Sequence, residues 1–343
     1  MVAEELKERE KQILRLVVHE FILTVNPVSS RSLARNYNPG YSPATIRNVM
    51  MNLEEKGFLQ QPHVSAGRVP TNLGYRFYVD SLMKPERLTS REKKIIFEDL
   101  NIVNADMNRI LERASKLLAK ISKQLGVVLI PHFYAGIFEK LELVPISGNR
   151  TLMVLKLSSG LVKTIMMTLD FQISREKLNT TARILNQRLC GLKLGEIKQT
   201  IDQRLRNISG GRGNMIQFFI KQADELFNFD AWENVYYGGA QNIVHQPEFT
   251  SRRSLESLMT LLDNRRNIAQ SLTKLADERK IVVKIGDENK DLNIQQCSLV
   301  TSSYYVGNVR GILGIIGPTR MQYSKIIPIV DYMSQVLSRV LTN

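Results

Sequence analysis

The segment from residue 42 to residue 57 carries polar side chains at a spacing that could bind nucleic-acid bases. The candidates in this segment are Ser42, Thr45, Arg47, Asn48 and Asn52. Residues three and four positions apart lie on one face of an α-helix, which would gather these side chains near its N-terminus. An arginine can bind guanine through two hydrogen bonds, and an asparagine can bind adenine in the same way. Taken alone, such a face is more often only a solvated surface. The neighbouring sequence must therefore distinguish a base-binding face from a solvated one.

The sequence around this segment meets the requirements of a helix-turn-helix. Ser29 or Ser30 can cap a short helix, and a turn is predicted at residues 38–40. Ser42 can then cap a second helix, because its hydroxyl accepts hydrogen bonds from amides of the first turn. A proline follows at the first helical position, where its missing N–H costs nothing, and Gly57 suits the end of the helix. The expected buried stripe of this helix consists of Ile46, Val49, Met50 and Leu53.

A predicted strand-turn-strand follows the second helix directly. Phe58 begins the first strand, "PHVSAG" forms the turn, and Arg68 begins the return strand. A hairpin in this position is typical of the wing of a winged helix, and Arg68 at its base could contact phosphate or the minor groove. His63 in the turn is a further DNA-binding candidate. Catalysis by His63 and Ser65 is disfavoured, because no acidic residue lies nearby to orient the histidine.

Composition and charge favour a soluble protein with a polyanionic partner. The 343 residues carry a formal net charge of +14, and residues 26–79 contain six Arg or Lys against two Glu. No apolar run approaches the ~18 residues that span a bilayer, and the N-terminus lacks the apolar core of a signal peptide. Two cysteines cannot form a disulfide framework. We therefore expect a cytoplasmic protein without membrane insertion.

The residues also argue against cofactor and metal chemistry. The four histidines are scattered along the chain and the two cysteines are isolated, so that no metal-ligand spacing exists. No convergent set of acid, base and nucleophile is visible. The methionine pairs at residues 50–51 and 166–167 are interpreted as core filler. We expect no cofactor, no metal and no enzymatic activity.

The hydrophobic periodicity indicates an α+β protein in which a helical block interrupts a β-rich domain. Beyond the helix-turn-helix, helices are predicted at residues 4–24, 91–125, 174–190, 194–207, 214–228, 251–278 and 322–341. Strand-type runs are predicted between residues 127 and 169 and at "NVYYGG", "KIVVKIG", "CSLVTSSYYV" and "GILGIIG". The return to strands after the helical block suggests an inserted domain.

Three long motifs in sequence resemble the HrcA family, the heat-inducible transcription repressors of bacteria. The first is "SPATIRNVMMNLEEKGFLQQPHVSAGRVPTNLGYRFYVDSL" near the N-terminus. The others are "VYYGGAQNIVHQPEF" with "IGDENKDLNIQQCSLVTSSYYVG", and "GILGIIGPTRMQYSKIIPIVDYMSQVLSRVL". The resemblance covers essentially the whole chain, although residues 171–235 match only in their helical character.

The resemblance implies an N-terminal winged helix-turn-helix joined to a GAF-like α/β domain with an inserted helical dimerisation domain. The corresponding ranges are 1–90 for the DNA-binding domain, 91–170 with 236–343 for the GAF-like domain, and 171–235 for the insertion. It also implies a homodimer that binds double-stranded DNA at an inverted-repeat (CIRCE-type) operator of chaperonin and chaperone operons. A GroE-type chaperonin would keep the repressor active, and heat would divert the chaperonin to unfolded proteins.

Two other functions remain as alternatives. One is a metabolite-responsive transcription regulator whose GAF-like domain senses a ligand, which ligand-dependent DNA affinity would reveal. The other is an enzyme that uses the winged helix as a targeting module, and the lack of a convergent catalytic set argues against it.

Overall fold

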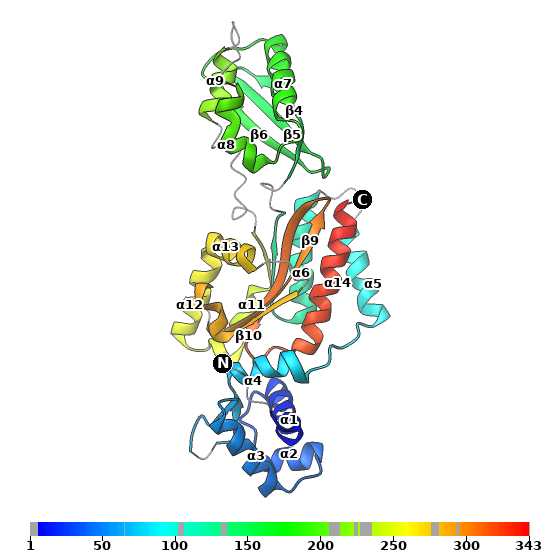
Figure 1. The fold of residues 1–343 in the computed structure, drawn as a ribbon, viewed down its shortest axis with the longest axis vertical. Coiled ribbons are helices and arrows are strands. Elements are labelled where there is room, and N and C mark those ends of the chain that lie inside the picture. Colours follow the sequence, from blue (N-terminus) through cyan, green and yellow to red (C-terminus); the bar gives the residue numbers. More distant parts are fainter. Residues whose placement is uncertain are drawn as a thin grey trace. The chain divides into compact units, whose positions relative to one another are not determined.

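The structure is a computed structural model of the α+β class that describes residues 6–64, 66–101, 106–131, 136–205, 213–222, 226, 235–275, 281–292 and 295–342. The chain forms two compact units (Figure 1). The first consists of residues 1–128, 236–302 and 313–334, and the second of residues 129–235, 303–312 and 335–343. Each unit is described by itself below.

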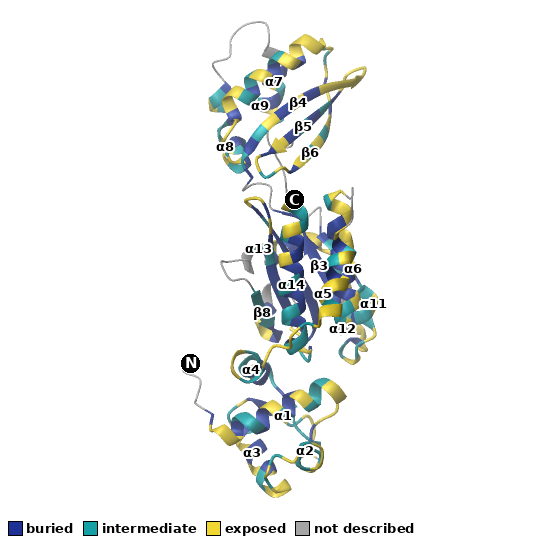
Figure 2. Cartoon of the chain, turned by 90° about the vertical axis from the view of Figure 1, so that its right-hand side faces the viewer, coloured by how far each residue is buried: buried dark blue, intermediate teal, exposed yellow. Residues whose placement is uncertain are grey.

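The first unit begins with three helices and a short hairpin, in the order predicted from the sequence. The helices are α1 (Glu8–Thr24), α2 (Ser30–Tyr37) and α3 (Pro43–Glu55), and the strands are β1 (Leu59–Gln60) and β2 (Val69–Pro70). The two strands pair antiparallel, with Leu59 opposite Pro70. Each of α1 and α3 has buried residues, which are dark in Figure 2. Ile13, Leu33 and Leu53 are fully buried in this core.

Further helices follow β2 in the first unit. They are α4 (Asn72–Phe77), the π-helical turn η1 (Tyr78–Leu82), α5 (Ser90–Leu100) and α6 (Met107–Ser122). The single helix predicted at residues 91–125 is wrong, because α5 ends at Leu100 and α6 starts anew. The start is fixed by Asp106, whose side chain accepts a hydrogen bond from the Arg109 N–H at 2.9 Å.

A five-stranded sheet forms the centre of this part of the chain. Its strand order is β7-β3-β10-β9-β8. The strands are β3 (Leu125–Leu129), β7 (Val235–Gly238), β8 (Ile281–Ile285), β9 (Cys297–Val306) and β10 (Val309–Pro318). The long C-terminal helix α14 (Tyr323–Thr342) packs on β9, where the hydroxyls of Ser302 and Ser334 lie 3.0 Å apart. Strands β7, β8 and β9 fall within the predicted strand-type runs, whereas β3 begins two residues before its run and β10 extends beyond both ends of "GILGIIG".

The segment between β7 and β9 contains α11 (Ala240–Val244), η4 (Pro247–Phe249), α12 (Arg252–Asp263), α13 (Arg265–Leu275) and η5 (Gly286–Leu292). The single helix predicted at 251–278 is therefore wrong. The chain breaks at Asn264, whose side-chain oxygen accepts a hydrogen bond from the Asn267 N–H at 3.2 Å and so begins α13.

The second unit contains a three-stranded antiparallel sheet in the order β4-β5-β6. The strands are β4 (Phe138–Ser147), β5 (Arg150–Leu157) and β6 (Val162–Thr168), and the helices are α7 (Arg175–Leu189), α8 (Leu194–Leu205) and α9 (Gly213–Lys221). The predicted ends of the last two helices, 207 and 228, lie outside the described residues. The predicted domain boundary at 170/171 falls inside this unit, because α7 packs on β4.

The outer edge of β4 is covered by a side chain of α7. The Asn186 carboxamide accepts a hydrogen bond from the Leu141 N–H at 2.7 Å and donates one to the Leu141 carbonyl at 2.9 Å. Farther along the same strand, Pro145 has no N–H to donate. This edge therefore cannot readily accept another strand.

Candidate nucleic-acid interface

Helix α3 is fixed at both ends by the residues that the sequence suggested. The Ser42 hydroxyl accepts a hydrogen bond from the Thr45 N–H at 3.2 Å, and Pro43 occupies the first turn. Gly57, two residues beyond the last helical residue, has a φ of +79°, a conformation that a residue with a Cβ rarely adopts. The start and the end of the predicted second helix are thereby confirmed.

The two faces of α3 differ as predicted. Ile46, Val49, Met50 and Leu53 are buried. Arg47, Asn48 and Asn52 are exposed, Thr45 is half-buried, and Ser42 is exposed at the cap. The methionines are only partly core filler: Met50 and Met167 are buried, whereas Met51 and Met166 are 43% and 52% exposed. The sequence-predicted polar residues of α3 thus lie together on an open face.

Carboxylates on α1 hold the other two helices in place, and the sequence analysis did not identify them. Glu20 accepts hydrogen bonds from the Tyr37 hydroxyl at 2.5 Å and from Asn36 at 3.1 Å, which connects α1 to α2. Burial, reinforced by the Glu20 carboxylate, raises the pKa of Tyr37 to about 12. Tyr37 therefore stays a hydrogen-bond donor at physiological pH.

Glu10 connects α1 to the end of α3. Its carboxylate accepts a hydrogen bond from the Lys7 N–H at 2.9 Å and pairs with the Lys56 ammonium at 3.2 Å. Burial acts to raise the pKa of Glu10, but these two contacts outweigh it, so the pKa lies below its ordinary value. The carboxylate is therefore ionised at neutral pH and retains its partners.

The side chain of Gln61 stabilises the turn between β1 and β2. Gln61 donates hydrogen bonds from its side-chain nitrogen to the carbonyls of Val64 at 2.9 Å and Ala66 at 3.0 Å. His63 is exposed and Val64 is 99% exposed, while Ser65 lies outside the described residues. Gln61 has no signature that sequence reasoning could have used, because its role depends on the path of the turn.

Arg68, which the sequence predicts as a contact for phosphate or the minor groove, is paired with a carboxylate within the fold. Its guanidinium donates to Glu54 Oε2 at 2.9 Å from Nε and lies 2.8 Å from the same oxygen through Nη2. Only 12% of its side chain is exposed, and its backbone pairs with Val28. Arg68 therefore fastens the base of the hairpin to the last turn of α3, and its contact with DNA stays a prediction.

The six basic residues of the segment 26–79 form two groups, those that pair with a carboxylate and those that do not. Lys56, Arg68 and Arg76 each have a carboxylate partner. Among the described residues, no carboxylate lies within ion-pair distance of the other three, which are the exposed Arg31, Arg35 and Arg47. Arg31 and Arg35 lie one turn apart on α2 and were not among the predicted site residues, although their spacing was a usable signal.

We expect Arg68→Ala to weaken the hairpin rather than to remove a phosphate contact. The substitution leaves Glu54 without its partner and should cost about 1–3 kcal/mol locally. Hydrogen exchange of the amides at residues 59–70 measures this loss, and Arg68→Ala should add little in a Glu54→Ala background. A salt dependence of DNA affinity that flattens by about 0.9 per protomer, with unchanged exchange, would contradict this role.

Among the described residues, no three His, Cys, Asp or Glu side chains gather where they could hold a metal ion. Cys297 is buried, which raises the pKa of its thiol to about 12, whereas Cys190 is exposed. None of the described helices is both long and apolar enough to cross a membrane.

Comparison with known proteins gives matches over the full length of the chain. A family model described as the HrcA protein C terminal domain matches residues 108–327. The heat-inducible transcription repressor HrcA of Chlorobium phaeobacteroides (strain BS1) is 38% identical over 353 aligned positions, covering 100% of both chains. The protein of that name from Prosthecochloris aestuarii (strain DSM 271 / SK 413) is 38% identical over 345 positions, covering 97% of each.

A solved structure supports the fold alone. It is described as the crystal structure of a hypothetical protein at 2.2 Å resolution. Its TM-score is 0.61 at 24% identity, and the alignment covers 98% of this chain and 99% of that one. Together, the family model and the full-length relatives show that the chain belongs to the HrcA family, which consists of heat-inducible transcription repressors and not of enzymes.

Proposed function

We propose that this chain represses heat-shock genes as a homodimer bound to an inverted-repeat, CIRCE-type operator of chaperonin and chaperone operons. The observation that carries the proposal is the open face of α3, where Arg47, Asn48 and Asn52 are exposed on a helix whose opposite face is buried. In a helix-turn-helix the second helix enters the major groove, where these side-chain types can bind guanine and adenine. The protein would act in the cytoplasm.

The remaining contacts in this proposal position the helix on the DNA. Arg31 and Arg35 on α2 would bind phosphate oxygens, because they are exposed cations next to α3. The braced hairpin with His63 would serve as the wing beside the groove. Residues 1–90 are then a winged-helix DNA-binding domain, and the five-stranded sheet with its helices is a GAF-like domain.

The dimer contact in this proposal is the open face of the sheet β4-β5-β6. One face of this sheet is covered by α7, whereas Figure 2 shows exposed segments on its strands. Val144, Leu152 and Met166 lie opposite one another across the three strands. Ile146 and Val162 on the same sheet are 50% and 54% exposed. An apolar row of this kind is suited to a second copy of the chain.

Dimerisation would couple two weak half-site interactions. A single domain with a few base contacts binds DNA weakly, and joining two domains makes the second binding event intramolecular. A symmetric dimer would bind an inverted repeat, because operator symmetry mirrors protein symmetry. The proposed inserted dimerisation domain then begins before residue 171, since the strands of the apolar face belong to it.

Dependence on a GroE-type chaperonin is supported by the topology of the central sheet. Strand β3 at residues 125–129 has β7 and β10 as neighbours, more than one hundred residues later in the chain. Pairing strands so far apart is slow and leaves apolar edges exposed meanwhile. A chaperonin that returns such states to the native fold would raise the active population, and unfolded clients would compete for it during heat.

Arg47→Ala is expected to weaken operator binding by about 1–3 kcal/mol and to relax base preference at one position in each half-site. Arg91→Ala, which removes an exposed arginine outside the interface, serves as the matched control. Binding to the operator and to random DNA is measured by titration. An equal loss on both DNAs would identify Arg47 as a phosphate contact instead.

Val144→Asp combined with Met166→Asp is expected to raise the dimer dissociation constant at least tenfold, because both side chains are already exposed in one protomer. Sedimentation velocity measures the change, and Met259→Asp is the control at an exposed methionine of the other unit. Deleting residues 171–235 is less informative, because it also strips α7 from the buried face. An intact dimer would place the contact elsewhere.

The proposed heat response predicts that chaperonin raises the fraction of repressor able to bind operator DNA, without changing the affinity of that fraction. Adding an unfolded client should lower the fraction again. The fraction is measured by stoichiometric titration with operator DNA, accompanied by a footprint over a chaperonin promoter. A fraction that is complete without chaperonin, and stays complete at heat-shock temperature, would exclude this mechanism.

A further inference from the structure

Helix α4 is the last element of the N-terminal head, a name used here for residues 8–77. It begins two residues after β2, and Thr71 caps it by accepting a hydrogen bond from the Gly74 N–H at 3.1 Å. The Thr71 hydroxyl also donates to the Gly57 carbonyl at 2.7 Å. The rings of Phe77 and Phe58 pack edge to face with centroids 5.4 Å apart. These contacts attach α4 to the segment that directly follows α3.

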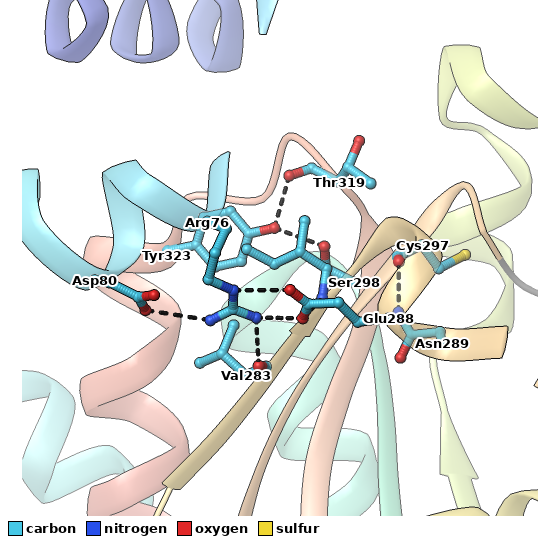
Figure 3. A network of polar contacts seen from close by, with 10 residues as sticks. Arg76, Asp80, Val283, Glu288, Asn289, Cys297, Ser298, Thr319 and Tyr323 are labelled. Atoms are coloured by element: carbon cyan, nitrogen blue, oxygen red, sulfur yellow. Dashed lines mark hydrogen bonds and ion pairs between the residues drawn. The ribbon is translucent and has the colours of Figure 1, made fainter. Parts of the chain in front are cut away.

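The same helix is joined to the body, defined as residues 90–128, 236–302 and 313–334, by Arg76 (Figure 3). The guanidinium of Arg76 binds both carboxylate oxygens of Glu288, through Nε at 2.9 Å and through Nη2. Nη2 also donates to the Val283 carbonyl at 2.7 Å, and Nη1 donates to Asp80 at 3.2 Å. This forked geometry fixes orientation as well as distance.

The acceptor side of this contact is itself fixed. Glu288 Oε2 accepts a second hydrogen bond, from the Ile285 N–H at 2.9 Å, which holds the carboxylate against the end of β8. Beside it, Asn72 donates to Asp287 at 2.8 Å. Gly286 between them has a φ of +53°, and a Cβ there would lie 2.3 Å from the Asn72 side chain. The approach of η5 to α4 thus requires glycine.

Buried aromatic residues lie under this polar contact. Tyr75 on α4 is 2% exposed and its ring lies 6.4 Å from that of Tyr323 at the start of α14. The Tyr323 hydroxyl donates to the Thr319 carbonyl at 2.7 Å and lies 2.6 Å from the Ser298 hydroxyl, as Figure 3 shows. Beyond α4, Glu86 donates from its N–H to the Ser324 carbonyl at 2.8 Å. The connection between head and body is therefore packed along its length.

We propose that Arg76 is a positioning residue for operator binding: its fork on Glu288 sets the angle at which each head is presented by the body. This inference rests on the proposed function. Two heads on one dimer can occupy two half-sites only if their separation and angle match the operator. A looser head would lower the effective concentration for the second half-site while leaving the contacts of each head with bases intact.

The first experiment measures the head-to-body distance without DNA. Spin labels are placed at Leu23→Cys on α1 and Lys120→Cys on α6, both exposed, in a Cys190→Ser background. Labelled chains are diluted with an excess of unlabelled protein so that only distances within one protomer are observed. The native chain should give one narrow distance distribution, whereas Arg76→Ala and Glu288→Gln should each broaden it. The double variant should broaden it no further, because both changes break the same contact.

The second experiment compares DNA affinities of the same variants, without labels, on three probes. These are the full inverted repeat, a single half-site, and inverted repeats whose spacer is changed by one to five base pairs. Arg76→Ala should bind the full repeat about tenfold more weakly, bind the half-site as the native chain does, and discriminate less among spacers. Arg113→Ala is the matched control, because it breaks a two-bond contact with Asp99 inside the body.

The outcomes separate this inference from the function on which it rests. A narrow distance distribution that survives both single substitutions overturns the positioning role, whatever the DNA results. A broadened distribution with unchanged spacer discrimination overturns its connection to operator binding. If the native chain binds none of the probes, the proposed function fails, while the distance measurement still decides whether Arg76 holds the head.

Discussion

The pairing of β3 with strands encoded more than one hundred residues later is the constraint on which the rest of the structure depends. Because β7 and β10 flank β3, the sheet is incomplete until most of the chain is present. The second unit is encoded almost entirely between β3 and β7, so closure of the sheet brings its two ends together. The binding site for Arg76 on the body also forms only when the sheet is complete, since Val283 lies in β8 and Glu288 lies beside it.

The N-terminal head is stabilised mainly by contacts among its own residues. Burial of Ile46, Met50 and Leu53 against the other helices determines which side of α3 remains exposed. Lys56 pairs with Glu10, Arg68 with Glu54 and Arg76 with Glu288, so half of the six basic residues in residues 26–79 are neutralised within the fold. The cations left over are those next to the polar face of α3. The charge available to a polyanion is thus set by internal pairing rather than by composition.

Most of the features that could be predicted from the sequence depend on residues that are close together in the chain. The cap at Ser42, the turn at Gly57 and the alternating strands depend on neighbouring residues, and they were correctly placed. The predicted continuous helices at 91–125 and 251–278 were wrong, because Asp106 and Asn264 begin new helices within a periodic pattern. The partner of Arg68 could not be foreseen, since fourteen residues and a hairpin separate it from Glu54. The contact between Arg76 and Glu288, 212 residues apart, depends on the complete fold.

The covered edge of β4 has a consequence for the way in which this chain can associate with others. A sheet edge with unpaired amides recruits strands from other molecules, which is a common route to aggregation. Asn186 occupies both backbone groups of Leu141, and Pro145 interrupts the donors farther along, so lateral growth of the sheet is blocked on this side. Strand addition by another molecule is therefore opposed at the β4 edge, whereas contact through the open face of the same sheet leaves these backbone groups untouched.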